Sequence, residues 1–118
     1  MGRVENLNIW KKSIELSKQI YKLTLESPGF RKDLGLKDQI QRSSVSIASN
    51  IAEGNDRETN AEFLRFLFIA RGSISELKTQ LIIASEIGYI DKNDFENILE
   101  NSEELHKMIN GFIKTLKK

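Results

Sequence analysis

The sequence predicts an all-α fold, an antiparallel up-down-up-down four-helix bundle. Three observations indicate it. Apolar residues recur every three to four positions, no segment alternates strictly between polar and apolar residues, and one proline and seven glycines leave few breaks. A chain of 118 residues suits one domain with one hydrophobic core, so residues 1–118 are expected to form a single domain.

Three interruptions divide the helical pattern into four segments. They lie near residues 27–35, 54–59 and 88–91, which leaves predicted helices before residue 27 and at 36–53, 60–87 and 92–118. Connections of only a few residues between long helices favour antiparallel neighbours. The economical topology is therefore up-down-up-down.

Capping signals agree with these breaks. Thr59 and Glu62 have the spacing of a capping box, so the third helix is expected to start near Thr59. Asp91 can accept hydrogen bonds from the free amides at the next helix start. Gly54 and Gly88 are expected to supply the left-handed conformation that commonly ends a helix.

The third predicted helix has a clear apolar seam. Its two adjoining rows repeat every seven residues and consist of Phe63, Ala70, Leu77 and Ala84, and of Leu67, Ile74 and Leu81. Such a seam is typical of a helix that packs inside a bundle.

Two of the helices carry more apolar surface than one seam requires. Five large apolar residues of the third helix lie off its seam: Leu64, Phe68, Ile69, Ile82 and Ile83. The second helix has a wide apolar arc that includes Val45, Ala48 and Ala52. Each large side chain that stays exposed loses roughly 1.5–3 kcal/mol of the stabilising free energy that burial would provide. These eight residues are therefore predicted to form an interface between copies of the chain. The alternative is that loops or the last helix cover them within one subunit.

Composition excludes several classes of protein. Without cysteine the chain can form neither a disulfide scaffold nor a thiolate metal site, and the cytoplasm is the expected location. No apolar run approaches the ~20 residues that span a bilayer, and the first residues lack the apolar core of a signal peptide. Neither a membrane nor a secreted location is indicated.

The chemical inventory argues against an enzyme. His106 is the single histidine, and Glu103-x-x-His106 forms only half of the motif that di-metal bundles use. No glycine-rich phosphate loop is present, and the serines of the second helix have no second histidine or obvious activating lysine nearby. We predict no catalytic residue, no metal and no cofactor.

Basic residues concentrate in the first half of the chain. Residues 1–54 hold nine Lys and Arg against six acids, a net +3, whereas residues 55–118 hold nine against eleven, a net −2. Phosphates of RNA could be contacted there. The leading candidates for that contact are Lys11, Lys12, Lys18, Lys22, Lys37 and Arg42. The alternative is that these lysines only make the helix surface hydrophilic and contact solvent.

Residues 39–54, QIQRSSVSIASNIAEG, closely resemble the QxRRAxxSIxxNIAEG signature of the 23S rRNA intervening-sequence proteins. A second block at residues 63–81 and the Gly88-Tyr89-Ile90 turn are similar to that family too, so the resemblance spans nearly the whole chain. The family signature maps onto Arg42, Ser46, Asn50, Glu53, Gly54, Gly72, Ser73 and Glu76. The departures are Gln41 in place of the first of two arginines, Ser43 in place of alanine, and a loop before the signature without the usual Phe-Pro and glutamate.

Physical roles can be suggested for three of the signature residues. Asn50 could bond backbone groups across an interface, Glu53 could cap or pair near the turn, and Gly54 could end the helix. A binding role for the same residues is the alternative, because binding sites often lie where polar groups interrupt an apolar surface.

The resemblance implies a bundle that assembles into a ring-like homopentamer, encoded in some bacteria within insertions in 23S rRNA genes. A relative, the accessory variability determinant of diversity-generating retroelements, is a similar pentamer that binds a reverse transcriptase and RNA. The expected function is a non-enzymatic, self-assembling helical scaffold that associates with RNA or a ribonucleoprotein. The alternative is a protein-binding adaptor that docks a partner such as a reverse transcriptase on the oligomeric ring.

Overall fold

The computed structural model describes residues 2–118. Helices account for 87% of the residues and the described range holds no strand, so the all-α class is confirmed. The elements are the 3-10 helix η1 (Val4–Asn6) and the α-helices α1 (Asn8–Glu26), α2 (Pro28–Lys32), α3 (Leu34–Asn55), α4 (Asn60–Glu86) and α5 (Lys92–Lys117). No helix in this range is long and apolar enough to cross a membrane.

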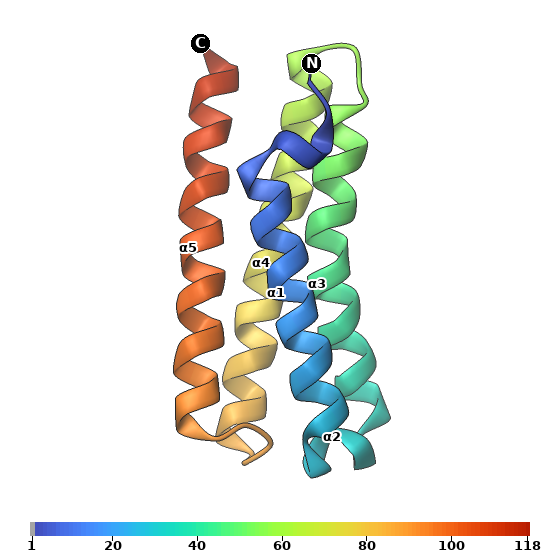
Figure 1. Ribbon diagram of the computed structural model, residues 1–118, viewed down its shortest axis with the longest axis vertical. Coiled ribbons are helices and arrows are strands. Elements are labelled where there is room, and N and C mark those ends of the chain that lie inside the picture. The colour runs from blue at the N-terminus through green and yellow to red at the C-terminus, as the bar shows by residue number, and fades with distance from the viewer. Residues whose placement is uncertain (1) are drawn as a thin grey trace.

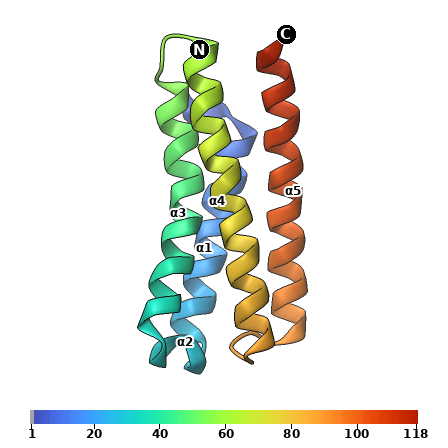
Figure 2. The same ribbon diagram turned by 180° about the vertical axis from the view of Figure 1, so that it is seen from behind.

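The four long helices lie side by side along the longest dimension of the molecule, which measures 44 × 21 × 20 Å (Figures 1 and 2). Contacts join α1 to α3, α3 to α4, α4 to α5 and α5 to α1. The colour order of Figure 1 shows each long helix running opposite to the one before it. The α1–α5 edge therefore lies across the bundle from the α3–α4 edge.

The first predicted break contains a short helix. Pro28 occupies the first turn of α2, where its missing N–H costs no hydrogen bond. Asp33 then caps α3, because its Oδ1 accepts from the Leu36 amide at 3.1 Å. The break is thus narrower than predicted, since one residue separates α2 from α3.

The other predicted helix starts are confirmed. The Thr59 hydroxyl accepts from the Glu62 amide at 3.2 Å, and the Asp91 carboxylate accepts from the Asp94 amide at 2.8 Å. Gly88 has a φ of 84°, a left-handed conformation in which glycine avoids the steric cost of a side chain. These local signals place the ends of α4 and the start of α5.

Gly54 corrects one prediction about helix ends. It lies inside α3, which continues to Asn55, and its φ is not positive. A Cβ at this position would lie 2.8 Å from Phe63 Cδ1 and 2.8 Å from Phe66 Cβ. Glycine is therefore needed here because α3 and α4 approach closely, not because the helix ends.

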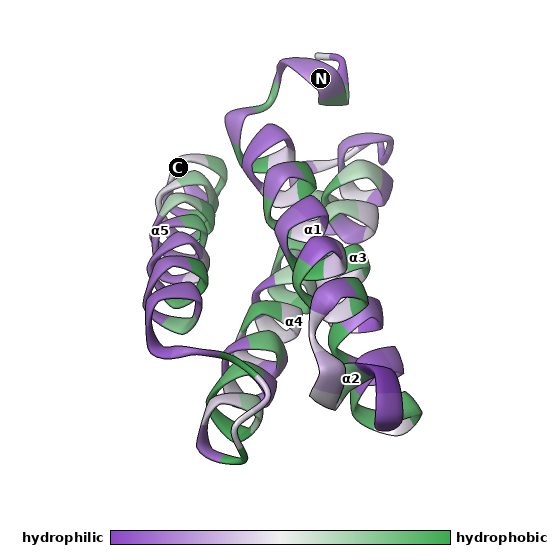
Figure 3. Cartoon of the chain, turned by 60° about the horizontal axis from the view of Figure 1, so that its bottom comes forward, coloured by the Kyte–Doolittle hydropathy of each residue, from purple (hydrophilic) through white to green (hydrophobic). Residues whose placement is uncertain are grey.

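The core follows the predicted seam. All seven seam residues of α4 are fully buried, and they meet buried side chains from the other long helices, among them Leu16 and Ile20 of α1, Ile47 and Ile51 of α3, and Leu105 and Ile109 of α5. Figure 3 shows hydrophilic colour along the outward sides of α1 and α5. The seam prediction is confirmed.

Tyr89 links the α4–α5 turn to α2 and to the two residues beside it, Ser27 and Asp33. Ser27 Oγ donates to the Tyr89 carbonyl oxygen at 2.7 Å. The Tyr89 hydroxyl donates to Asp33 Oδ2 at 3.0 Å, and the Tyr89 ring meets the Phe30 ring edge-on, with 5.3 Å between the ring centres. The pKa of Tyr89 is raised above its usual value; the hydrogen bond to Asp33 is the largest cause and burial is the second. A Cβ on Gly29 would collide with this ring, so glycine is required there.

Candidate interaction surfaces

The large apolar residues predicted to lie off the seam of α4 are on its outer side. Phe68, Ile69, Ile82 and Ile83 are between 39% and 46% exposed in the single chain, and we call them the α4 apolar face. Leu64, predicted with them, is half-buried against the core. The four side chains of the α4 apolar face stay exposed although Lys117 of α5 lies 5.6 Å from the centre of the Phe68 ring, so cover within one subunit accounts for Leu64 but not for these four.

Small residues separate the two halves of the α4 apolar face. Gly72, Ser75 and Thr79 lie on the same exposed side of the helix, because steps of three and four residues return to one face. A Cβ on Gly72 would meet nothing within 4 Å. Glycine inside a helix costs about 1 kcal/mol relative to alanine, and no contact within the subunit offsets that cost.

The apolar arc of α3 contributes less surface than predicted. Val45 is 42% exposed and Ala52 is half-buried, so both reach the surface. Ala48 is only 7% exposed, because it faces the interior of the bundle, and it therefore does not belong to the predicted surface.

Three signature residues form one hydrogen-bonded group where α3 meets α4. The hydroxyls of Ser46 and Ser73 lie 2.8 Å apart across the two helices. Asn50 Nδ2 donates to the Ser46 carbonyl at 2.8 Å and to its hydroxyl at 3.0 Å. Asn50 was expected to bond across an interface, but here it supports the serine of its own helix. These residues have a structural role within the subunit.

Apart from the buried Gly54, the remaining signature residues are exposed. Arg42 pairs with Asp38 at 2.8 Å on the surface of α3, and Glu53 and Glu76 face solvent. Within residues 2–118, no capping or pairing contact of Glu53 is found, so the expected capping role has no support. Exposed ion pairs such as that of Arg42 contribute only about 0–1 kcal/mol.

The six basic candidates do not form one surface. Lys11, Lys18 and Lys22 share one outward side of α1, along about 16 Å of helix. Lys12 instead turns toward α5, where its Nζ lies 3.4 Å from Glu104 Oε2. Lys37 and Arg42 lie on α3, and Lys37 is half-buried. Lys18 pairs only with exposed Glu15 at 3.3 Å, so the α1 lysines stay accessible to phosphates.

His106 lies on α5, where it faces α4. Its Nδ1 is 3.0 Å from Lys78 Nζ, which can donate to that nitrogen only while the imidazole is neutral. The pKa of His106 is lowered below its usual value; burial is the largest cause, and the positive charges of Lys78 and Arg71 add to it. Within residues 2–118, no group of three or more His, Cys, Asp or Glu side chains could hold a metal. His106 contributes to the contact between α4 and α5 through Lys78.

This lowered pKa predicts a loss of stability in acid. As the pH falls below 6.5, the usual pKa of histidine, the unfolded chain takes up a proton that the folded chain resists, so the free energy of unfolding falls. His106→Gln is expected to lose less stability between pH 7.5 and 5 than the wild type. Urea unfolding at both pH values measures the difference. Equal losses in the two proteins would show that His106 does not contribute to the pH dependence.

The sequence profile of the 23S rRNA-intervening sequence proteins matches residues 5–111 of the chain. A crystal structure of a protein of unknown function from the S23 ribosomal protein family of Bacteroides thetaiotaomicron VPI-5482 is also similar. The two proteins share 29% sequence identity with a TM-score of 0.84, over 90% of this chain and 98% of that chain. Among curated proteins no match is found. The similarity extends over almost the full length of both chains.

Proposed function

Because the chain belongs to the 23S rRNA-intervening sequence protein family, we propose that it is a non-enzymatic, self-assembling helical scaffold that associates with RNA or a ribonucleoprotein. Its subunit is an antiparallel up-down-up-down four-helix bundle. Its resemblance to the family implies a ring of five subunits.

The α4 apolar face supports self-assembly. Four large side chains that are each about two-fifths exposed leave apolar surface on α4, and contact with a second subunit would remove that surface from water. Gly72 lies between them, where the missing side chain would let a neighbouring helix approach closely. We assign exposed Val45 and half-buried Ala52 of a neighbouring subunit as the opposing surface. Light scattering should give several times the 13.5 kDa mass of one chain, whereas a single-chain mass at micromolar concentration would contradict self-assembly.

The lysines on α1 support association with RNA. Lys11, Lys18 and Lys22 of each subunit would repeat around the assembly, and several weak patches that act on one polymer bind it more strongly than one patch does. Contacts to phosphates carry no base information, so binding should show little sequence preference.

Charge reversal of the α1 lysines is expected to weaken RNA binding. Lys18→Glu with Lys22→Glu should lower the affinity for structured rRNA fragments roughly tenfold or more, and raising salt from about 50 to 200 mM should have a similar effect, because each neutralised phosphate releases a counterion. Filter binding measures both. Lys107→Glu with Lys114→Glu on α5 is the matched control, with the same change of charge on exposed residues. If the intact oligomer retains no RNA at low salt, the protein-binding adaptor becomes the preferred function.

A further inference from the structure

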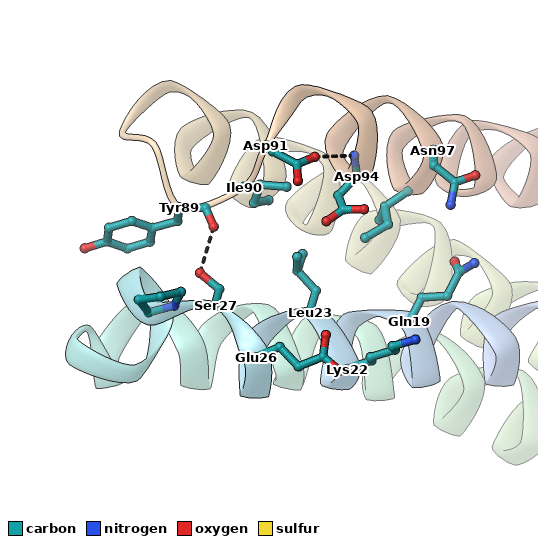
Figure 4. A pocket seen from close by; sticks show the side chains of 12 residues that line it. Gln19, Lys22, Leu23, Glu26, Ser27, Tyr89, Ile90, Asp91, Asp94 and Asn97 are labelled. Carbon is teal, nitrogen blue, oxygen red and sulfur yellow. Dashed lines mark hydrogen bonds between the residues drawn. The ribbon is translucent and has the colours of Figure 1, made fainter.

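A groove lies between α1 and α5, at the end of the bundle where α1 ends and α5 begins (Figure 4). Its volume is about 600 Å³, within the range of about 300–1,000 Å³ typical of ligand sites. One wall comes from the last turns of α1 and the other from the first turns of α5, and Ile90 of the connecting turn lies between them.

The groove combines an apolar base with an acidic rim. Leu23, Ile90 and Ile98 supply the apolar surface, and the last two are 5% exposed. Glu26, Asp91 and Asp94 line the rim together with one cation, Lys22, which leaves two net negative charges. The α1 C-terminus and the α5 N-terminus meet here, and their partial charges of about half a unit are opposite in sign and offset each other.

Two of the carboxylates are free to bind a ligand. Asp91 already accepts from the Asp94 amide, Ser27 donates to the Tyr89 carbonyl, and Gln19 accepts from Asn101 at 3.0 Å. Across the described residues, the Glu26 and Asp94 side chains form neither an ion pair nor a hydrogen bond. They line the groove from opposite walls: the Asp94 carboxylate points toward α1, and the Glu26 side chain lies along α1 beside Lys22 (Figure 4).

We propose that this groove docks a short segment of a partner protein that is rich in arginine or lysine and aliphatic residues. The stem of a basic side chain would lie on Leu23 and Ile98, and its charged end would lie between Glu26 and Asp94. A carboxylate rim repels phosphates, so RNA is not the occupant. The α1–α5 edge lies across the bundle from the α3–α4 edge, so the groove does not overlap the surface proposed for self-assembly.

A labelled peptide tests this docking site. The probe is acetyl-Leu-Arg-Leu-Arg-Leu-amide carrying a fluorophore, and the same peptide with glutamate in place of arginine is its counterpart. Fluorescence anisotropy at low salt should detect binding of the arginine peptide only. Glu26→Lys with Asp94→Asn should weaken that binding at least tenfold, because the rim changes from a net charge of −2 to +1.

Glu15→Lys with Glu100→Gln is the matched control, because it changes the charge of α1 and α5 equally without touching the groove. The control should bind the peptide within twofold of the wild type, and methyl signals of Leu23, Ile90 and Ile98 should shift in the wild type on titration. The proposal is overturned if the wild type does not bind the arginine peptide, if both variants lose binding equally, or if the shifts occur elsewhere. A changed oligomer mass in the groove variant would instead identify the groove as a subunit contact and also overturn it.

Discussion

Phe68→Glu is expected to convert the assembly into single folded subunits of 13.5 kDa. Phe68 lies in the α4 apolar face, 39% exposed, and does not contribute to the buried seam. A carboxylate at an apolar contact must lose its water, which costs several kcal/mol per ion. In the separated subunit the same carboxylate would face solvent near Arg71 and Lys117, whose charged ends now lie 5.1 and 5.6 Å from the Phe68 ring.

Light scattering measures the mass of this variant, and circular dichroism shows whether it remains helical. Leu34→Glu is the matched control, since Leu34 is 69% exposed at the start of α3 and lies outside the α4 apolar face. The control should keep the mass of the wild type. A Phe68→Glu protein that also keeps this mass would place the subunit contact elsewhere.

Gly54→Ala is expected to destabilise the fold, although alanine normally strengthens a helix. The new methyl group would lie 2.8 Å from the Cβ of Phe66, which cannot move without its backbone, and equally close to the Phe63 ring. Overpacking of this kind costs about 1–3 kcal/mol, and the helix preference of alanine returns at most about 1 kcal/mol. The net expected loss is up to about 2 kcal/mol in the free energy of unfolding, measured by urea titration.

Gly111→Ala provides the opposite expectation. Gly111 lies within α5, and a Cβ there would meet nothing within 4 Å. Alanine should therefore stabilise the protein by up to about 1 kcal/mol. If Gly54→Ala stabilised the protein to a similar degree, the close approach of α3 and α4 could not be the reason for glycine at that position.

Most of the fold could be predicted from the sequence because local signals determine it. Thr59, Asp91 and Gly88 act through amides and backbone angles within a few residues of themselves, and the seam of α4 follows from its period alone. The same periodicity identified the α4 apolar face, since Phe68 and Ile82 lie off the seam. The helix α2 was missed because Pro28 and two nearby glycines indicate a break as readily as a short helix start.

The features that were missed depend on residues far apart in the chain. Glycine is common at helix ends, so the sequence suggests that role for Gly54. Only the positions of Phe63 and Phe66, on the other side of the α3–α4 turn, show that Gly54 has a packing role. The hydroxyl contact of Ser46 with Ser73 and the α1–α5 groove depend on how the helices are placed side by side. Charge counts grouped the basic residues correctly by segment, but Lys12 turns away from Lys11 because neighbours in a helix point about 100° apart.

The contact between Ser46 and Ser73 has a consequence for how α3 and α4 are aligned. An apolar seam that repeats every seven residues stays apolar when one helix slides along the other by one repeat, about 10.5 Å, so apolar packing alone discriminates weakly between the two alignments. Such a shift would bring Ser46 opposite Phe66 or Gln80 in place of Ser73. Opposite Phe66, the hydroxyl would lose its partner. One pair of small polar side chains therefore disfavours the alignment that places Ser46 opposite Phe66, which the apolar residues alone would tolerate.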